Sequence, residues 1–343
     1  MKAAFYTGSK HFSVEDIDPR PPAADEVQID VGYCGICGTD MHVYQGHMDK
    51  RVGFHRIIGH EMSGVITAVG EGAGPLVPGD RVVVRPLAPC GHCPACRAGY
   101  AHICHKLNFI GLDSDGALQQ KWNVPKHTIH KIPASMSLRQ AVLVEPTAVA
   151  CHVVRRSRLT AGEDVLVIGG GPIGMLVAMV AAHAGGNVAL TEINPLRLQI
   201  ARDLGVKTVM AENGDVAAAV HAATGSKGAD VVFEVSGSRA GARLMTAAAS
   251  TRGRIAMVAI HAERPEVDLF QFFWRELEMI GCRVYEPQDY DQAIDLIARG
   301  AITPHRLITD VVGLDQVNQA FAALDGNAKA MKSLIVVNES LAN

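Results

Sequence analysis

The stretch DVLVIGGGPIGMLVAMVAAHAGGNVALTE, residues 164–192, decides how the second half of this chain folds. The apolar run VLVI (165–168) is typical of a buried parallel strand, and the segment 172–185 has the composition of a helix that ends in glycine. Three glycines and a proline at 169–172 interrupt a run that would otherwise approach the length of a bilayer span. The stretch therefore predicts strand, turn and helix, and not a membrane helix.

The same alternation continues along the chain. Helical patterns lie at 172–185, 195–205 and 242–250, and short apolar strand patterns lie at 165–169, 187–192, 207–211, 230–237, 254–260 and 279–284. Repeated βαβ units with right-handed crossovers build a doubly wound parallel α/β sheet of the Rossmann type. The last strand would be an exposed edge, so we expect it to pair with its two-fold mate in a homo-oligomer.

The turn after the first strand carries the pattern G-x-G-x-x-G at Gly169, Gly171 and Gly174, with Pro172 and Ile173 before the last glycine. In a dinucleotide-binding unit the first glycine makes the tight turn, the second admits a pyrophosphate, and the third lets the helix pack on the strand. The free N–H groups of the helix N-terminus then face the phosphates. We therefore expect these five residues to bind NAD, the alternative being a purely structural turn.

Glu192 ends the next strand pattern, where dinucleotide-binding units place an acidic residue. A carboxylate there accepts hydrogen bonds from the adenosine ribose hydroxyls and repels a 2′-phosphate, which favours NAD over NADP. Arg197 follows five residues later and could swing toward such a phosphate. Both residues are predicted to belong to the cofactor site.

The first part of the chain has a different sequence pattern, with strand-like and few helix-like segments. Short β-type runs at 27–38, 63–72 and 80–91 are separated by Gly and Pro, without a long helical pattern. Helical spacing at 290–300 and 314–327 precedes a strand pattern at 333–338, and we expect this tail to pack back on the N-terminal domain. We predict a mainly β domain at 1–147, a dinucleotide-binding domain at 148–284, and the returning segment at 285–343.

Length and composition agree with a two-domain globular protein. The chain has 343 residues, 48% of them hydrophobic, and its 32 Lys and Arg against 35 Asp and Glu give a net charge of −3. Without a basic excess there are few counterions to release, so a nucleic-acid partner is disfavoured. The N-terminus lacks the apolar core of a signal peptide and no lipidation motif ends the chain, so we expect a cytoplasmic protein without a membrane partner.

Six of the eight cysteines lie in the first third of the chain, at spacings that indicate metal binding and not a disulfide scaffold. Cys90, Cys93, Cys96 and Cys104 share one loop in the pattern C-x2-C-x2-C-x7-C. Four thiolates complete a tetrahedron around zinc and leave no open position, which makes a structural site. An iron–sulfur cluster and a disulfide loop are the alternatives.

A second set of candidate ligands is dispersed along the chain. Cys37 lies in CGTDMH (37–42), His60 and Glu61 lie in GHE (59–61), and Glu145 lies in VEPTAVACH (144–152). Together they offer a thiolate, an imidazole and two carboxylates. Three protein ligands leave a fourth position for water or substrate, so this set predicts an open, catalytic zinc site and two zinc ions per chain.

These motifs occur in a fixed order: GYCGICGTDMH (32–42), GHEMSGVI (59–66), PGDRV (78–82), the four-cysteine loop, VEPTAVACH and VLVIGGGPIG (165–174). In them the whole chain resembles the zinc-dependent medium-chain alcohol dehydrogenases, and within that family the polyol, or sorbitol-type, branch. The resemblance implies a GroES-like catalytic domain formed by the N-terminal and C-terminal segments, a Rossmann-type domain between them, and a tetramer.

The resemblance also implies the roles of individual ligands. It matches Cys37 and His60 to ligands of the catalytic zinc, and Glu61 to the carboxylate that ligates this zinc in polyol-type enzymes. Glu145 stands where ethanol-type relatives place a second cysteine, and in the polyol branch this residue reaches the metal through water.

Three residues near Cys37 match positions that serve this zinc site in the family. Thr39 and His42 match the relay that carries the alcohol proton toward solvent. Asp40 matches the carboxylate that orients a ligating histidine, and such a carboxylate also fixes the tautomer of the ring.

These features predict an NAD-dependent zinc enzyme that oxidises a secondary alcohol to the ketone by hydride transfer, with a polyol, vicinal diol or sugar derivative as its small-molecule substrate. The alternative is a non-catalytic NAD-binding or redox-sensing protein that holds only the structural zinc. That alternative explains the four-cysteine loop but not the second ligand set. Two departures from the family pattern, GALQQKW (116–122) and Arg283, concern the substrate and not the reaction type.

Overall fold

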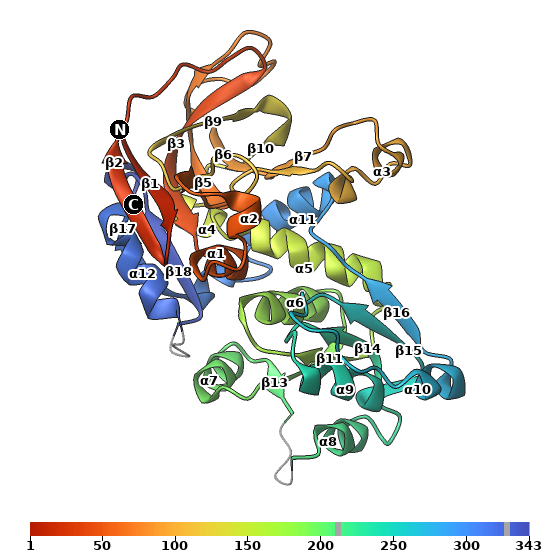
Figure 1. Ribbon diagram of the computed structural model, residues 1–343. Coiled ribbons are helices and arrows are strands. Elements are labelled where there is room, and N and C mark those ends of the chain that lie inside the picture. The colour runs from red at the N-terminus through yellow and green to blue at the C-terminus, as the bar shows by residue number, and fades with distance from the viewer. Residues whose placement is uncertain (210–213, 326–329, 343) are drawn as a thin grey trace. The chain divides into compact units, whose positions relative to one another are not determined.

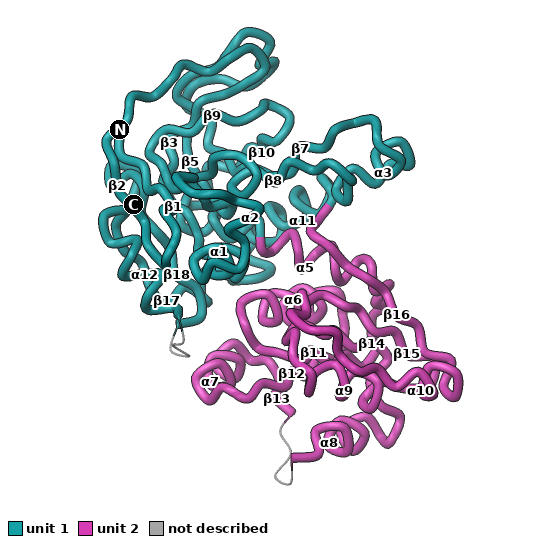
Figure 2. The backbone as a smooth tube through the Cα atoms, viewed as in Figure 1, with its two compact units in different colours: residues 1–145, 286–343 teal, residues 146–285 magenta. Residues whose placement is uncertain are grey.

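The computed structural model describes residues 1–209, 214–325 and 330–342 and divides into two compact units (Figures 1 and 2). Unit 1 comprises residues 1–145 and 286–343, and unit 2 comprises residues 146–285. These bounds lie one or two residues from the expected ones, 147/148 and 284/285.

Unit 2 is built on a parallel sheet with the strand order β13-β12-β11-β14-β15-β16. The chain runs outward from β11 through β12 to β13 and then returns to β14 on the other side of β11. The order therefore reverses between β11 and β14, which confirms the predicted doubly wound Rossmann-type sheet. The strands are β11 (Asp164–Ile168), β12 (Asn187–Thr191), β13 (Lys207–Thr208), β14 (Ala229–Glu234), β15 (Ala249–Met257) and β16 (Glu278–Gly281).

The helices between these strands begin at the residues that helix chemistry favours. Asn194 and Ser238 accept hydrogen bonds from first-turn N–H groups of α7 and α9, and Pro172 and Pro195 occupy the first turns of α6 and α7. The helices are α6 (Pro172–His183), α7 (Pro195–Asp203), α8 (Val216–Ala223), α9 (Arg239–Ala248) and α10 (Leu269–Arg275).

Two expectations for unit 2 need adjustment. The helix expected at 242–250 ends at Ala248, and the next two residues already belong to β15. The strand expected at 207–211 is described only as β13, because residues 210 and 211 lie outside the described residues. The core of the unit is apolar and continuous between sheet and helices; it includes Leu166, Val232, Met245, Ala248 and Ile255.

Unit 1 is built on a seven-stranded sheet with the order β10-β6-β5-β3-β18-β17, with β9 also paired to β3. The C-terminal strand β18 runs antiparallel to β3, with Leu334 opposite Gly35 and Ile335 opposite Cys34. The tail of the chain therefore returns to the N-terminal sheet, as predicted (Figure 1). The strands are β3 (Glu26–Gly35), β5 (Glu61–Val69), β6 (Arg81–Val84), β9 (Lys121–Pro125), β10 (Ile129–Lys131), β17 (Ile308–Gly313) and β18 (Lys332–Val336).

Smaller elements complete unit 1. The remaining strands are β1 (Lys2–Gly8), β2 (His11–Asp16), β4 (Arg56–Ile57), β7 (Leu87–Ala88) and β8 (Asn108–Phe109). The helices are α1 (Gly38–Tyr44), α2 (Asp49–Val52), α3 (Pro94–Arg97), α4 (Leu138–Ala141), α11 (Pro287–Ala298) and α12 (Val317–Leu324), with α5 (Val144–Ser157) beginning in unit 1 and continuing into unit 2. Single 3₁₀ turns lie at Ala101–Ile103, Lys126–Thr128, Pro304–Leu307, Leu314–Gln316 and Glu339–Leu341. Residues 326–327 of the expected helical stretch 314–327 lie outside the described residues.

No helix in the described part of the chain is both long enough and apolar enough to cross a membrane.

Candidate functional site

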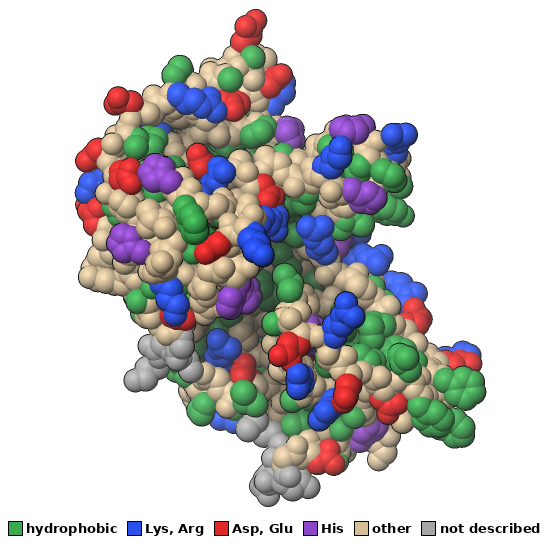
Figure 3. All heavy atoms as spheres, in the orientation of Figure 1, with side chains coloured by type: hydrophobic (Ala, Val, Ile, Leu, Met, Phe, Trp, Pro, Cys, Tyr) green, Lys and Arg blue, Asp and Glu red, His purple; other side chains and the backbone are tan. Residues whose placement is uncertain are grey.

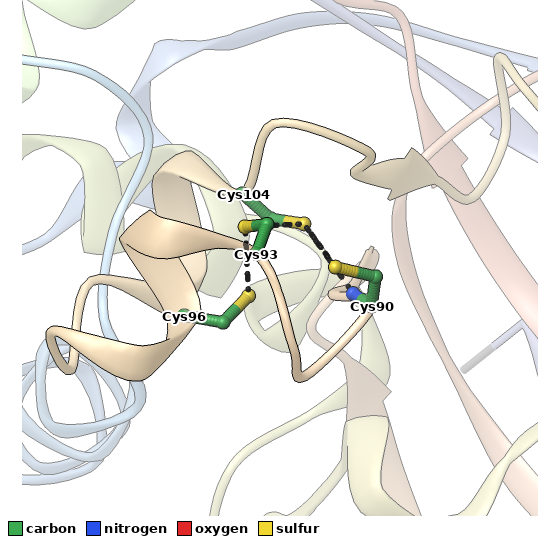
Figure 4. A group of neighbouring side chains, drawn as sticks. All are labelled: Cys90, Cys93, Cys96 and Cys104. Atoms are coloured by element: carbon green, nitrogen blue, oxygen red, sulfur yellow. Dashed lines mark hydrogen bonds between the residues drawn. The ribbon is translucent and has the colours of Figure 1, made fainter.

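The four-cysteine loop of unit 1 brings its thiols together (Figure 4). The four Sγ atoms all lie within 4.8 Å of one another, with neighbouring pairs at 3.4 to 3.7 Å. Tetrahedral zinc with Zn–S bonds of about 2.3 Å requires Sγ–Sγ distances of about 3.8 Å, so the loop fits a single ion. A disulfide would need about 2.05 Å, and all eight cysteines are free thiols.

Backbone N–H groups point at these sulfur atoms. The N–H groups of His105 and Lys106 donate to Cys93 and Cys104 over 3.4 and 3.3 Å, and that of Cys90 donates to Cys104. Donors of this kind favour the thiolate, and the backbone N–H groups of Cys96 and His105 lower the pKa of Cys93 to about 6. Cys93 is therefore prepared to supply an anionic sulfur to zinc, whereas burial and the neighbouring thiols of Cys93 and Cys104 raise the pKa of Cys96 to about 12.

A second group of donors in unit 1 joins Cys37, His60 and Glu61, whose ligand atoms lie within 4.8 Å of one another. Cys37 is the N-cap of α1, and His60 and Glu61 stand at the start of β5. The histidine and the glutamate are 2% and 1% exposed, so polar atoms there need partners. A thiolate, an imidazole and a carboxylate are a donor set that fits zinc and leaves one position open.

Asp40 links the first two of these donors. Its Oδ2 accepts the backbone N–H of Cys37 at 2.9 Å, and its Oδ1 lies 3.4 Å from His60 Nδ1. Burial disfavours a charged His60, but Asp40 and Cys37 outweigh it and raise the pKa of this imidazole well above its usual range. Zinc binding would displace the ring proton, since a ligating histidine is neutral.

Lys332 is a member of this site that the sequence analysis missed. Its Nζ donates to the Glu61 carboxylate and to the carbonyl of Ile36, the latter at 2.9 Å, although the side chain is only 3% exposed. Burial opposes its charge, but Glu61 and Cys37 raise the pKa of Lys332 above its usual value. A Cβ at Gly35 would meet the Glu61 carboxylate, so β3 passes close to this ion pair at Gly35.

The other predicted residues of this site lie nearby on α1 and α5. Thr39 is half-buried and His42 exposed, and both stand on α1, three residues apart on the same face. Glu145 is buried in the first turn of α5 and adds to the negative charge that acts on Lys332. It lies outside the group formed by Cys37, His60 and Glu61, so its predicted contact through water stays a prediction.

The glycine-rich turn lies at the carboxyl end of β11 in unit 2, with Gly171 as the N-cap of α6. Gly169 has a φ of +102°, which favours glycine. A Cβ at Gly174 would overlap the carbonyl of Gly169, so the third glycine lets the helix pack against the turn. Pro172 and Ile173 lie in the first turn of α6, and phosphate binding at this helix N-terminus stays a prediction.

Glu192 lies at the end of β12 beside this turn. Its carboxylate accepts hydrogen bonds from the backbone N–H groups of Gly170 (2.8 Å), Ile193 (2.7 Å) and Asn194 (2.9 Å). Arg197 places a guanidinium nitrogen 3.7 Å from the same carboxylate. The predicted cofactor residues are thus brought together, with a carboxylate and a guanidinium side by side.

Two family patterns match this chain: the alcohol dehydrogenase GroES-like domain over residues 23–134 and the zinc-binding dehydrogenase domain over residues 172–299. A 2-dehydro-3-deoxy-L-galactonate 5-dehydrogenase of Pseudoalteromonas atlantica is 53% identical over 98% of this chain and 99% of its own length. A sorbitol dehydrogenase of Halalkalibacterium halodurans is 31% identical over 98% of this chain and 99% of its own length. The chain belongs to the zinc-dependent medium-chain alcohol dehydrogenase family. The resemblance to its polyol branch is confirmed.

Solved structures agree with this membership. A dehydrogenase of Escherichia coli CFT073 in complex with NADH has a TM-score of 0.91 at 29% identity and covers 98% of this chain and 99% of its own. A protein of Sinorhizobium meliloti 1021 described as a zinc-binding dehydrogenase and bound to NADP has a TM-score of 0.91 at 30% identity over 98% of both chains. The chain is an oxidoreductase of this family, and the predicted cofactors, zinc and a nicotinamide dinucleotide, are confirmed.

Proposed function

We propose that this dehydrogenase oxidises a secondary alcohol of a hydroxyl-rich sugar derivative to the ketone, with NAD as hydride acceptor. The observation that carries the proposal is the group of Cys37, His60 and Glu61, which offers an open zinc site in unit 1. A relative named for a sugar-acid dehydrogenase shares 53% of its residues over 98% of this chain, which favours a sugar acid oxidised at a secondary carbon.

Zinc, when bound by Cys37, His60 and Glu61, acts as a Lewis acid that lowers the pKa of the substrate alcohol toward neutrality. Cys37 and His60 hold the ion, and Asp40 orients the imidazole. Lys332 balances the charge of Glu61, and its ammonium group donates to Oε2 of this carboxylate. Glu145 adds a second carboxylate that reaches the site through water.

The proton of the substrate alcohol leaves the site along side chains of α1. The hydroxyl of Thr39 takes part in a hydrogen-bonded path for the alcohol proton, and His42, which is exposed on the same helix face, passes it to solvent. A nicotinamide dinucleotide held by unit 2 would supply the hydride acceptor. Thr39 and His42, both on α1, are thus the two residues of this chain that transfer the proton: Thr39 at the alcohol and His42 at the solvent.

Unit 2 binds the dinucleotide through Gly169, Gly171 and Gly174 at the phosphates and Glu192 at the adenosine ribose. The Glu192 carboxylate is anchored by three backbone N–H groups, so it cannot move away from a 2′-phosphate without losing them. Solved relatives hold NADH or NADP; in this chain Glu192 favours NAD, and Arg197 offsets that preference only in part.

We also infer a homo-oligomer, a dimer or tetramer, that forms at the outer edge of unit 2. β16 is the last strand of its sheet, and unpaired edges invite pairing with a second copy. Next to it, Leu269, Phe270, Phe273 and Trp274 of α10 are 61 to 79% exposed, and hydrophobic side chains gather over this helix (Figure 3). An aromatic surface of this kind marks an interaction site. The cytoplasm remains the proposed location.

A substrate panel tests the proposal. Initial rates are measured with 2-dehydro-3-deoxy-L-galactonate, sorbitol, butane-2,3-diol and ethanol, each with NAD and with NADP. We expect the sugar acid with NAD to give the highest kcat/KM and ethanol the lowest, because a site built on hydrogen bonds to hydroxyls rejects analogues that lack them. Best activity with ethanol would contradict the substrate class.

Zinc content separates the enzyme from its non-catalytic alternative. Two zinc ions per chain, measured by mass spectrometry of metals on the purified protein, support the enzyme. One ion, lost only when the four-cysteine loop is changed, would support a nucleotide-binding protein with a structural zinc alone.

A further inference from the structure

Unit 2 contains a buried carboxylate–imidazole pair that the proposed roles do not use. His261 Nε2 lies 3.0 Å from Glu234 Oε2, and the two side chains are 12% and 0% exposed. Glu234 is the last residue of β14, and His261 follows β15 by a few residues. A fully buried glutamate is rare unless it is paired. Here the imidazole of His261 is one of its partners, and we therefore ask what the pair does.

Glu234 also holds the loop that follows it. Its Oε1 accepts hydrogen bonds from the backbone N–H groups of Ser236 (3.0 Å) and Gly237 (3.1 Å) and from the Ser236 hydroxyl at 2.5 Å. A Cβ on Gly169 would meet Ser236 at 3.0 Å, so this loop lies directly against the first glycine of the phosphate-binding turn. Glu234 therefore connects that turn with His261.

The position of the pair in the sheet points to one half of the cofactor. Ligands of doubly wound sheets bind outside the carboxyl ends of the strands, at the point where the strand order reverses. Here the reversal lies between β11 and β14, and Glu192, on the β12 side, is assigned to the adenosine half. Glu234 and His261 stand at the carboxyl ends of β14 and β15, on the opposite side, where the nicotinamide half would extend.

Of the two ring nitrogens of His261, only Nε2 is engaged by Glu234. Glu234 accepts the hydrogen bond from Nε2, and Nδ1 makes no hydrogen bond within the described residues. A carboxylate that receives the N–H of one nitrogen fixes the tautomer, so in the neutral imidazole Nδ1 is an acceptor. The nicotinamide half of NAD carries matching donors, namely the ribose hydroxyls and the carboxamide N–H2.

We propose that His261, oriented by Glu234, binds the nicotinamide half of the dinucleotide through Nδ1. This inference rests on the proposed function of unit 2 and adds to it a residue that positions the reacting half of the cofactor. Glu234 acts through His261 and through the loop at Ser236, without touching the cofactor itself.

Binding to the full-length protein tests this directly, without turnover. NADH is titrated by fluorescence, and ADP and ADP-ribose by calorimetry, against the unaltered protein and His261→Gln, which keeps an N–H for Glu234 but has no acceptor in the place of Nδ1. We expect NADH affinity to fall about three- to tenfold, the effect of one hydrogen bond, and ADP affinity to stay the same. A parallel loss of ADP-ribose affinity assigns the contact to the ribose, and an unchanged value assigns it to the carboxamide.

A second variant guards against a purely structural effect. Glu234→Gln keeps the shape of the side chain but can donate to Nε2, which would move the ring proton to Nδ1 and remove the acceptor. It should weaken NADH binding as His261→Gln does, with ADP binding preserved. Equal losses for NADH and ADP, or no loss for NADH, would overturn the inference. Failure of the unaltered protein to bind NADH would instead overturn the proposed cofactor site itself.

Discussion

The two ligand groups of unit 1 contain similar donors but are assembled in different ways. The four cysteines come from one loop, residues 90–104, and two of them, Cys93 and Cys104, accept backbone N–H groups of this loop and of the two residues after it. Cys37, His60 and Glu61 come from two elements, and the lysine that partners Glu61 lies 271 residues further along the chain. The first group is therefore local in sequence, whereas the second is brought together by the fold.

This difference has an energetic meaning. In a closed site the metal supplies folding energy, because its bonds join all four ligands of the loop. In the second group the buried Glu61–Lys332 pair, Asp40 and the sheet already hold the donors in place. Zinc there is expected to supply chemistry and little stability, so the two sites should respond in opposite ways to mutation and to metal removal.

The largest expected effect is on activity, at the open site. Cys37→Ser removes a thiolate ligand and should lower kcat/KM on the order of a thousandfold or more, because a Lewis acid contributes several kcal/mol to the reaction. The melting temperature and NADH binding should remain nearly unchanged. Steady-state kinetics, thermal unfolding and fluorescence titration of one preparation give all three values.

The matched control is Cys282→Ser, a thiol of unit 2 outside both ligand groups. It should keep activity and zinc content. If Cys37→Ser retained most of its activity, or if it unfolded like a destabilised core variant, the distinction between the two sites would fail.

The second effect is on stability, at the same site. Lys332→Met leaves the Glu61 carboxylate buried without its partner, which should cost about 3–5 kcal/mol and lower the melting temperature by roughly 10 °C. The loss should be the same in zinc-free protein, because the pair is part of the fold. Thermal unfolding with and without a chelator measures this.

The double variant Glu61→Gln/Lys332→Met serves as the control, since it removes both charges and should recover much of the lost stability. Lys332→Arg keeps the charge and should lose less than Lys332→Met. A double variant no more stable than Lys332→Met would mean that the lysine contributes by packing and not by its charge.

The contrast between the sites also explains what the sequence could and could not predict. The four-cysteine loop and the turn at Gly169–Gly174 are contiguous, so spacing alone predicted which residues meet. For Cys37, His60 and Glu61 the residue types suggested an open zinc site that also included Glu145, and only the resemblance gave each ligand its role, because nothing local brings residue 37 beside residue 60. Lys332 was missed because a lysine that opens a strand normally faces water, whereas here it opens an inner strand between β3 and β17 and is 3% exposed.

The fold of unit 2 shows the same limit. Alternating apolar strands and helices predicted the doubly wound sheet, because each βαβ unit is local in sequence. The helix α10 was not predicted, since its aromatic sequence LFQFFWR also suits a strand. Glu192 was expected to face a ribose, yet its oxygens also accept three backbone N–H groups that no spacing rule reveals.

The third effect is on the closed site. Cys93→Ser removes one of four thiolates and should lower zinc content from two ions to one and the melting temperature by about 5–10 °C. The loss should disappear when zinc-free proteins are compared, in contrast to Lys332→Met. Metal analysis and thermal unfolding, each with and without chelator, distinguish the two cases. An unchanged melting temperature would mean that the loop is ordered without its metal.

The smallest effect concerns how the open site holds its ion. Asp40→Asn keeps an acceptor for the Cys37 N–H but removes the negative charge that lies 3.4 Å from His60 Nδ1, so the imidazole loses part of its orientation. Changes of this kind typically weaken metal binding by about 10- to 100-fold. Competition with a zinc chelator measures the affinity, and added zinc should restore the activity that the variant loses.

Asp30→Asn, which breaks a half-buried pair with Lys121 at 2.6 Å, is the control and should leave zinc affinity unchanged. If Asp40→Asn bound zinc as tightly as the unaltered protein, the imidazole would be positioned by its burial beside Phe109, 5.2 Å away between ring centroids, and not by the carboxylate.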